Sequence, residues 1–178
     1  MFHKHPQALL GIILLLSLTS SNASTIIYDV ANVSGNTWEY TYTLNNDMLS
    51  VDIEEFTIWF DVDLFENLAV GTTPADWDPL VIDPDPDLPP DGDDGFYDAL
   101  ALISGIAPGD SLGGFIVQFD YLGTGTPGNQ YFQVINPNTF ATIDDGFTQS
   151  AVVPIPAAIW LFGTGLIGLL APGVLRKT

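Results

Sequence analysis

Carboxylates are the only side chains in the central part of this sequence that could take part in acid–base or metal chemistry. The 178 residues include 22 aspartates and glutamates, which all lie between Asp29 and Asp145, and no cysteine. The basic and imidazole side chains all lie near the two ends: His3, Lys4, His5, Arg176 and Lys177. Residues 24–175 therefore exclude Ser-His-Asp, Cys-His and Schiff-base catalysis, zinc sites with histidine or cysteine ligands, and arginine clamps for phosphate.

Carboxylate pairs are what remains for catalysis. Two facing acids could hydrolyse a glycosidic bond. The sequence has four glutamates that could contribute to such a pair: Glu39, Glu54, Glu55 and Glu66. Glu39 lies on the polar side of a predicted strand, and nothing in the sequence pairs it with a second acid. We therefore expect a protein without enzymatic activity.

Aspartates are densest around the middle of the chain, at residues 83–98, and they form the best candidate for a metal site. They are Asp83, Asp85, Asp87, Asp91, Asp93, Asp94 and Asp98. The first five could supply oxygens to Ca²⁺, which takes roughly six to eight. The spacing is not that of an EF-hand, because Leu88 occupies the glycine position. Pro84 and Pro86 favour extended backbone that separates neighbouring acids. A solvated acidic spacer without a cofactor is the favoured interpretation, and a weak calcium site is the alternative.

The charge balance restricts the partners. Residues 24–175 combine 22 acidic side chains with no lysine or arginine. Nucleic-acid binding depends on basic side chains that displace counterions, so we expect no nucleic-acid partner. A cation or a basic partner is compatible with this charge, and so is a surface that is acidic only for solubility.

The part of the sequence between the two terminal segments has the pattern of β-strands. In "NTWEYTYTL", residues 36–44, the apolar side chains alternate with polar ones at Trp38, Tyr40, Tyr42 and Leu44, which is typical of a half-buried strand. Similar patterns occupy residues 24–33, 52–62, 112–122, 131–136 and 139–143, with glycine- and proline-rich turns between them. This spacing predicts an all-β, antiparallel β-sandwich for the domain at residues 24–152.

One stretch interrupts the strands. Six prolines between Pro74 and Pro90 exclude a helix or an interior strand, so residues 72–95 are predicted to be a long acidic, proline-rich loop. Trp77 lies in this stretch, and Trp59 lies in a predicted strand. Either tryptophan could stack on a sugar ring if exposed, although a tryptophan in a sandwich is more often part of the core.

The N-terminal segment has the three parts of a secretory signal peptide. A short basic region precedes an apolar run from Ala8 to Leu18, and small residues follow. We predict a signal peptide at residues 1–23, with cleavage between Ala23 and Ser24. An uncleaved anchor is less favoured, because the run is shorter than the roughly 20 residues that span a bilayer.

The C-terminal segment, residues 153–178, predicts a membrane helix. Residues 157–175 have no charged side chain, and they are followed by Arg176 and Lys177, which indicate a cytoplasmic end. A proline motif precedes the helix: Val153, Pro154, Ile155, Pro156 and Ala157. Residue types alone predict a single transmembrane anchor.

The segment "VPIPAAIWLFGTGLIGLL" with its basic end resembles the PEP-CTERM sorting signal, in its VPLPA-type form. Such tails are recognised by exosortases, membrane-embedded proteases of Gram-negative bacteria. The resemblance implies export, transient anchoring and cleavage near Pro156. It also implies delivery to the cell envelope, cell surface or a polysaccharide-rich extracellular matrix, as in biofilms.

Two functions follow as expectations. The first is a non-enzymatic exosortase substrate, with the membrane and an exosortase as partners and envelope polysaccharide as a further one. The alternative is a surface module that uses the same route and binds calcium or a glycan.

Overall fold

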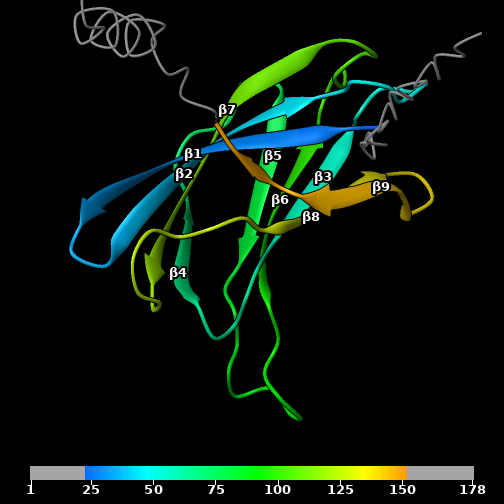
Figure 1. Cartoon of the computed structure of the whole chain (residues 1–178). Coiled ribbons are helices and arrows are strands. Elements are labelled where there is room, and N and C mark those ends of the chain that lie inside the picture. Colours follow the sequence, from blue (N-terminus) through cyan, green and yellow to red (C-terminus); the bar gives the residue numbers. More distant parts are fainter. Residues whose placement is uncertain (1–22, 152–178) are drawn as a thin grey trace, which may run out of the picture.

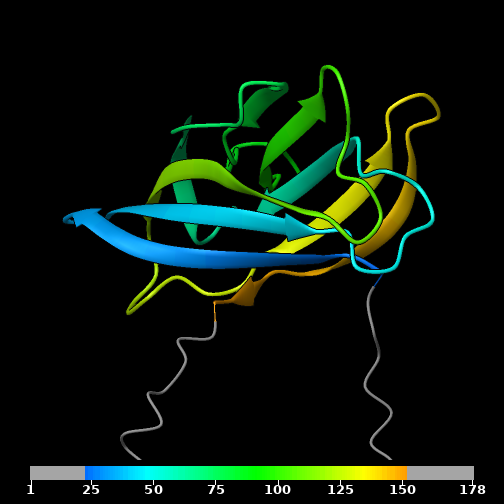
Figure 2. The ribbon, with the colours of Figure 1, turned by 90° about the horizontal axis from the view of Figure 1, so that it is seen from above.

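A computed structural model describes residues 23–151 as ten β-strands in two five-stranded sheets. Figures 1 and 2 show the two sheets as stacked layers of one sandwich. The predicted signal peptide up to residue 22, the C-terminal helix and the sorting motif lie outside the described residues. Within residues 23–151 the structure has no helix of membrane-spanning length.

The first sheet has the strand order β10-β1-β2-β7-β4. Its strands are β1 (Thr25–Ser34), β2 (Thr37–Asn45), β4 (Phe65–Val70), β7 (Ser111–Tyr121) and β10 (Gln149–Ser150). Neighbouring strands are antiparallel except for β1 and β10, which are parallel. β1 and β2 follow each other in the sequence and form an antiparallel hairpin.

The second sheet has the strand order β5-β6-β3-β8-β9 and is antiparallel throughout. Its strands are β3 (Glu55–Phe60), β5 (Trp77–Ile82), β6 (Gly95–Ala101), β8 (Tyr131–Asn136) and β9 (Ala141–Phe147). The prediction of an all-β protein built from a sandwich of sheets is confirmed.

Aromatic side chains fill the space between the sheets. Tyr40 on β2 is fully buried and stacks on Phe119 of β7, with ring centroids 4.7 Å apart. Phe56 of β3 meets Phe115 of β7 edge to face at 5.0 Å. Such contacts between rings add to the free energy gained from burying their apolar area. The alternation predicted for these strands is therefore the alternation between core and outer face.

The predicted loop at residues 72–95 differs in the structure, because β5 lies inside it. Pro79 is paired with Ala99 of β6 within this strand. Proline lacks the N–H that a central strand donates on both sides, but β5 is an edge strand and needs to pair on one side only. The prediction of a loop is wrong for residues 77–82, and the exclusion of an interior strand is correct.

The connection from β5 to β6 forms a projecting hairpin, here called the finger (residues 83–94). Backbone hydrogen bonds of 2.9 Å join Asp85 and Asp93 in both directions. Figure 1 shows the finger extending away from the body of the sandwich, below β5 and β6. The acidic stretch is therefore an extension of the second sheet.

The two edge strands β4 and β5 lie next to each other at one side of the sandwich. The ladder of β4 with β7 shifts register between Glu66 and Ala69, where Asn67 has a positive φ of 56°. Such irregularities bend a strand and interrupt its regular edge. Each of these two edges thus contains a residue that disturbs strand pairing: Asn67 in β4 and Pro79 in β5.

Candidate functional site

The outer face of the second sheet is where the structure gathers exposed apolar side chains. On β3, Phe56, Ile58 and Phe60 point into the core and are fully buried. The alternation of a strand therefore places Thr57 and Trp59 on the outer face. Trp59 is half-buried there, so its ring is partly accessible from solvent.

Strand register extends this outer face into a line across the sheet. Trp59 is opposite Phe96 on β6, which in turn is opposite Ile82 on β5. On the other side, Ile58 is opposite Phe132, so the antiparallel register brings Tyr131 of β8 next to Trp59. Tyr131 is opposite Phe147 on β9. We call these five side chains the aromatic row: Ile82, Phe96, Trp59, Tyr131 and Phe147.

The rings of the aromatic row contact one another and are accessible from solvent. The ring centroids of Trp59 and Phe96 are 5.4 Å apart, and those of Tyr131 and Phe147 are 5.7 Å apart. Phe147 is 58% exposed and Ile82 is 47% exposed, at opposite ends of the row. Exposed large apolar side chains that line up in this way mark a binding surface more often than isolated ones do.

A hollow of about 360 Å³ lies beside the row, at the end of the sandwich where β3 ends and β8 begins. Trp59, Tyr131 and Phe147 contribute to its wall. Its exposed polar side chains come from the neighbouring loops: Asp61, Asp94 and Asn129. The hollow thus combines aromatic surface with hydrogen-bonding groups, which is the usual composition of a ligand pocket.

A buried amide positions the segment that leads into β8. The Gln130 side chain is almost fully buried, and its Oε1 accepts a hydrogen bond of 3.1 Å from the Tyr42 hydroxyl. Its Nε2 donates to the Tyr40 hydroxyl and to the Gly128 carbonyl. The Gln130 backbone N–H donates to the Thr148 hydroxyl at 2.9 Å. Tyr131 therefore follows a residue that is fixed in the core.

Tyr131 is also held from the far side. Its hydroxyl donates to Asp145 Oδ2 of β9 at 3.1 Å. Burial raises the pKa of the Tyr131 phenol, and the hydrogen bond to the Asp145 carboxylate raises it further. The phenol therefore stays a neutral hydrogen-bond donor at physiological pH.

A second line of residues on the same face is polar. Thr57 on β3 donates from its hydroxyl to Asp98 Oδ1 of β6 at 2.6 Å. Burial raises the pKa of Asp98, although the Thr57 hydrogen bond opposes the shift. Burial, and then the charge of Asp98, raise the pKa of Glu55. Among residues 23–151, Glu55 Oε2 and Trp59 Nε1 are buried atoms without a hydrogen-bond partner.

Glu55 and Asp98 lie on the neighbouring strands β3 and β6, where burial and then the charge of Asp98 raise the pKa of Glu55. They lie on the outer face of the sheet and line neither the hollow beside the aromatic row nor the larger cavity described below. The other glutamates lie elsewhere: Glu39 accepts a hydrogen bond of 2.9 Å from Gln118 on the first sheet. Glu55 and Asp98 therefore do not face each other across a substrate cleft, which is the arrangement that glycoside hydrolysis needs.

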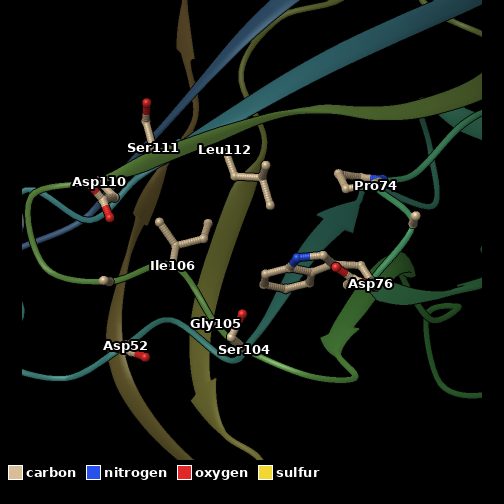
Figure 3. A pocket seen from close by; sticks show the side chains of 12 residues that line it. Asp52, Pro74, Asp76, Ser104, Gly105, Ile106, Asp110, Ser111 and Leu112 are labelled. Atoms are coloured by element: carbon tan, nitrogen blue, oxygen red, sulfur yellow. The ribbon is translucent and has the colours of Figure 1, made fainter.

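A larger cavity, of about 510 Å³, lies at the opposite end of the sandwich, between the start of β5 and the connection from β6 to β7. Figure 3 shows the side chains of Pro74, Ile106 and Leu112 pointing into it. Carboxylates stand on three sides of the opening: Asp52, Asp76 and Asp110. This cavity suits a neutral or cationic group and disfavours an anion.

The predicted metal ligands lie along the finger and at its base. Asp83 Oδ1 accepts a hydrogen bond from the backbone N–H of Leu68, and Asp85 Oδ1 accepts one of 3.0 Å from Asp87. The remaining two, Asp91 and Asp93, are exposed. In the part of the chain that the structure describes, no three Asp, Glu, His or Cys side chains are arranged to hold a metal ion. The calcium site stays a prediction.

The structure separates the two tryptophans that the sequence offered for sugar stacking. Trp77 is only 5% exposed, and its ring meets Phe115 edge to face at 5.2 Å. Trp77 is therefore a core residue on the inner side of β5, as the favoured interpretation held, and it is not available for sugar stacking. Trp59 lies on the outer face, where Phe96, Tyr131 and Phe147 join it.

The comparisons with known proteins give only distant structural likenesses. No protein-family model matches the sequence, and no curated protein matches it significantly. One similar solved structure is a family 3b carbohydrate-binding module from the biomass-sensing system of Clostridium clariflavum. It is 13% identical, with a TM-score of 0.36, over 57% of this chain and 72% of that chain.

A second similar structure belongs to the biomass-sensing modules of RsgI-like proteins from Clostridium thermocellum, which resemble a family 3 carbohydrate-binding module of the cellulosome. It is 9% identical, with a TM-score of 0.38, over 70% of this chain and 88% of that chain. Both TM-scores are low, so neither structure serves to assign a ligand or a site residue to this chain.

Proposed function

We propose that this protein is a non-enzymatic, exported surface protein whose β-sandwich binds a neutral polysaccharide across the aromatic row. The observation that carries the proposal is the row itself, which places four rings and Ile82 in one line on an exposed sheet face. Sugar rings have apolar C–H faces that stack on aromatic rings, and hydroxyl edges that need polar partners.

The length of the row favours a chain over a single sugar. Five strands contribute to it, and four strand spacings of about 4.8 Å give roughly 19 Å. That length accommodates several consecutive units of an extended polysaccharide. The hollow beside Trp59 and Tyr131 offers polar groups at one border of the row, where Asp94 and Asn129 can bond hydroxyls.

Charge favours a neutral ligand. Residues 24–175 have no lysine or arginine to pair with a uronate, sulfate or phosphate group, and they carry all 22 acids. An acidic polysaccharide would be repelled by this field, whereas a neutral one would not.

The delivery route rests on the sequence of the tail. The proline motif at residues 153–157, the uncharged stretch and the basic Arg176 and Lys177 resemble a sorting signal that an exosortase cleaves. The intact mass of the protein from native cells tests this route. A mass that ends near Pro156, and that extends to Thr178 when the exosortase is deleted, supports it; the full tail in both strains contradicts it.

Affinity electrophoresis tests the binding site. The exported chain would run in native gels that contain hydroxyethylcellulose, xyloglucan or dextran, with alginate as the acidic comparison. We expect at least one neutral polysaccharide to retard it and alginate not to. Phe147→Ala should weaken binding about twofold to twelvefold, from about 0.5–1.5 kcal/mol for one stacked ring. Trp59→Ala, at the centre of the row, should weaken it at least as much.

Phe140→Ala is the matched control. Phe140 is 81% exposed, more than any ring of the row, but it lies in the turn between β8 and β9. Retention should stay unchanged in this variant. If no neutral polysaccharide retards the protein, or if Phe140→Ala weakens retention as much as Phe147→Ala does, the proposed site is wrong.

A further inference from the structure

Ser24, the residue that precedes β1, is fixed between the two sheets. It is 1% exposed, and both its backbone nitrogen and its hydroxyl donate to Asp144 Oδ2, at 2.7 Å and 2.6 Å. Asp144 belongs to β9 of the second sheet, whereas Ser24 leads into β1 of the first. The two hydrogen bonds therefore join the sheets at the side of the sandwich opposite β4 and β5.

We propose that removal of residues 1–23 converts this contact into an ion pair between the new α-ammonium group of Ser24 and the Asp144 carboxylate. The inference rests on the proposed export, which includes cleavage after Ala23. A signal peptidase hydrolyses the Ala23–Ser24 bond with one water: Ala23 leaves with a carboxylate, and the Ser24 nitrogen keeps its hydrogen and gains protons to become ammonium. The nitrogen that becomes charged is the one that already donates a hydrogen bond to Asp144.

The charge of the domain gives this ammonium group its importance. Residues 24–175 contain no lysine, arginine or histidine, so the α-ammonium of Ser24 is the only cation in that whole range after cleavage. A hydrogen bond between an ammonium and a carboxylate is about twice as strong as one between neutral groups. The single cation is thus created at a partly enclosed carboxylate that connects both sheets.

Cleavage also has a cost in this region. The carbonyl of Ala23 accepts a hydrogen bond of 2.8 Å from the backbone N–H of Met48, and this contact leaves with residues 1–23. The Ser24 hydroxyl keeps its bond to Asp144 in either form. The gain on cleavage therefore comes from the charge on the Ser24 nitrogen, which is what the experiment must isolate.

Amine labelling isolates it, because the sequence contains so few amines. In the exported chain the reactive amines are the Ser24 α-amine and, if the tail is retained, Lys177. The protein is treated with acetic acid N-hydroxysuccinimide ester for increasing times and then cut before aspartate. Because Asp29 is the first acid, the peptide 24–28 reports the α-amine by mass, separately from Lys177.

Three variants separate the ion pair from a merely structural contact. Asp144→Asn keeps a hydrogen-bond acceptor but removes the charge. Asp145→Asn, at the next residue, is the control, since Asp145 accepts a bond from Tyr131 and none from Ser24. A glycine inserted between Ala23 and Ser24 keeps every side chain and the Ser24 amide bond, but moves the ammonium group one residue away from Asp144.

The expected results are specific to the charge. Labelling of the α-amine should be about tenfold faster or more in Asp144→Asn than in the native chain, the factor that corresponds to about 1.4 kcal/mol of local opening. The glycine insertion should accelerate it similarly and lower the Tm, while Asp145→Asn should leave the rate unchanged. Equal labelling rates and an equal Tm in the native and glycine-inserted chains would overturn the inference.

Failure of the export proposal gives a different result. If the signal segment is not removed after Ala23, the peptide 24–28 is absent. The mass of the N-terminal peptide that ends at residue 28 then shows where the chain actually starts. If the peptide is present and its amine reacts at the rate of an unpaired terminus in all variants, export stands and the ion pair falls.

Discussion

The two outer faces of the sandwich are built from the same strand geometry but differ in how their polar groups are satisfied. On the first sheet, Thr37 donates to Asp120 at 2.7 Å, and Asn67 donates to the other oxygen of Asp120 at 3.0 Å. On the second sheet, the aromatic row lies beside two buried polar atoms, Trp59 Nε1 and Glu55 Oε2, which lack partners among residues 23–151.

The difference shows on which face the polar groups have hydrogen-bond partners without a ligand. On the first face, cross-strand hydrogen bonds satisfy the side chains of Asp120 and Glu39 without a ligand. The second face exposes rings and encloses carboxyls whose pKa values are raised. Residues that reduce stability in this way are commonly found at functional sites. The comparison therefore supports the outer face of the second sheet as the one that binds a ligand, here called the working face.

The largest expected difference between the faces comes from one substitution made on each. Thr57→Val removes the hydroxyl that donates to the partly buried Asp98, and Thr37→Val removes the one that donates to Asp120, which keeps a second donor in Asn67. Threonine and valine have similar shape and both favour strands. We expect Thr57→Val to lower the free energy of unfolding by about 1–3 kcal/mol, because it leaves a buried acceptor unsatisfied.

Thr37→Val should lower the free energy of unfolding by about 0.5 kcal/mol or less, since water replaces the lost donor. Urea unfolding of both variants at neutral pH measures the two values. Equal losses would mean that the two faces are equally solvated, and the contrast between them would disappear.

A smaller effect concerns acid, where the two faces should respond with opposite sign. The pKa of Glu55 is raised, so the folded protein takes up that proton before the unfolded chain does, and stability rises as the pH falls through the folded pKa. The hydrogen bonds from Thr37 and Asn67 lower the pKa of Asp120 below 3.8. Its stabilising contribution is present above that value and is lost as the pH falls through the folded pKa.

Glu55→Gln should therefore raise the free energy of unfolding at neutral pH, by about 0.5 kcal/mol or less because the group is partly solvated. Asp120→Asn should lower it slightly and remove part of the acid-induced loss. Urea midpoints at several values between about pH 3 and pH 7 test both. A loss of stability in Glu55→Gln at neutral pH would show that its carboxylate has a stabilising partner.

The smallest effect is expected for Gln118→Ala on the first face. This change removes a hydrogen bond of 2.9 Å to Glu39 on an outer surface, so the free energy of unfolding should change by about 0.5 kcal/mol or less. Retention by polysaccharide should not change at all. Weaker retention in affinity gels would place ligand contacts on the first sheet as well and would contradict the assignment of one working face.

The fold could be predicted from local sequence patterns, but the candidate binding site could be predicted only in part. Alternation at Tyr40 and Tyr42 is a local property, and it correctly separated core from surface. The sequence left open whether Trp59 lies on the core side or on the outer side of its strand. Its neighbours in the row could not be predicted, because Phe96, Tyr131 and Phe147 become adjacent only through pairings between strands far apart in the sequence.

The prolines near β5 predicted a loop where the structure has a strand, and the reason is physical. A density of six prolines predicts the absence of strands that pair on both sides, but the sequence does not say which strand forms an edge. Pro79 is tolerated because β5 pairs only with β6. Trp77 therefore became a core residue, and the acidic finger at residues 83–94 became a hairpin extension.

Pro79 has a further consequence for how the sandwich meets other copies of itself, if the protein is displayed on a surface as proposed. Crowded sandwiches with an open edge can join edge to edge into continuous sheets, and an exposed aromatic face increases that hazard. Here the two adjacent edges are interrupted, by Pro79 in β5 and by the irregular backbone at Asn67 in β4. Both edge strands at this side of the sandwich are therefore poor templates for edge-to-edge pairing with another copy.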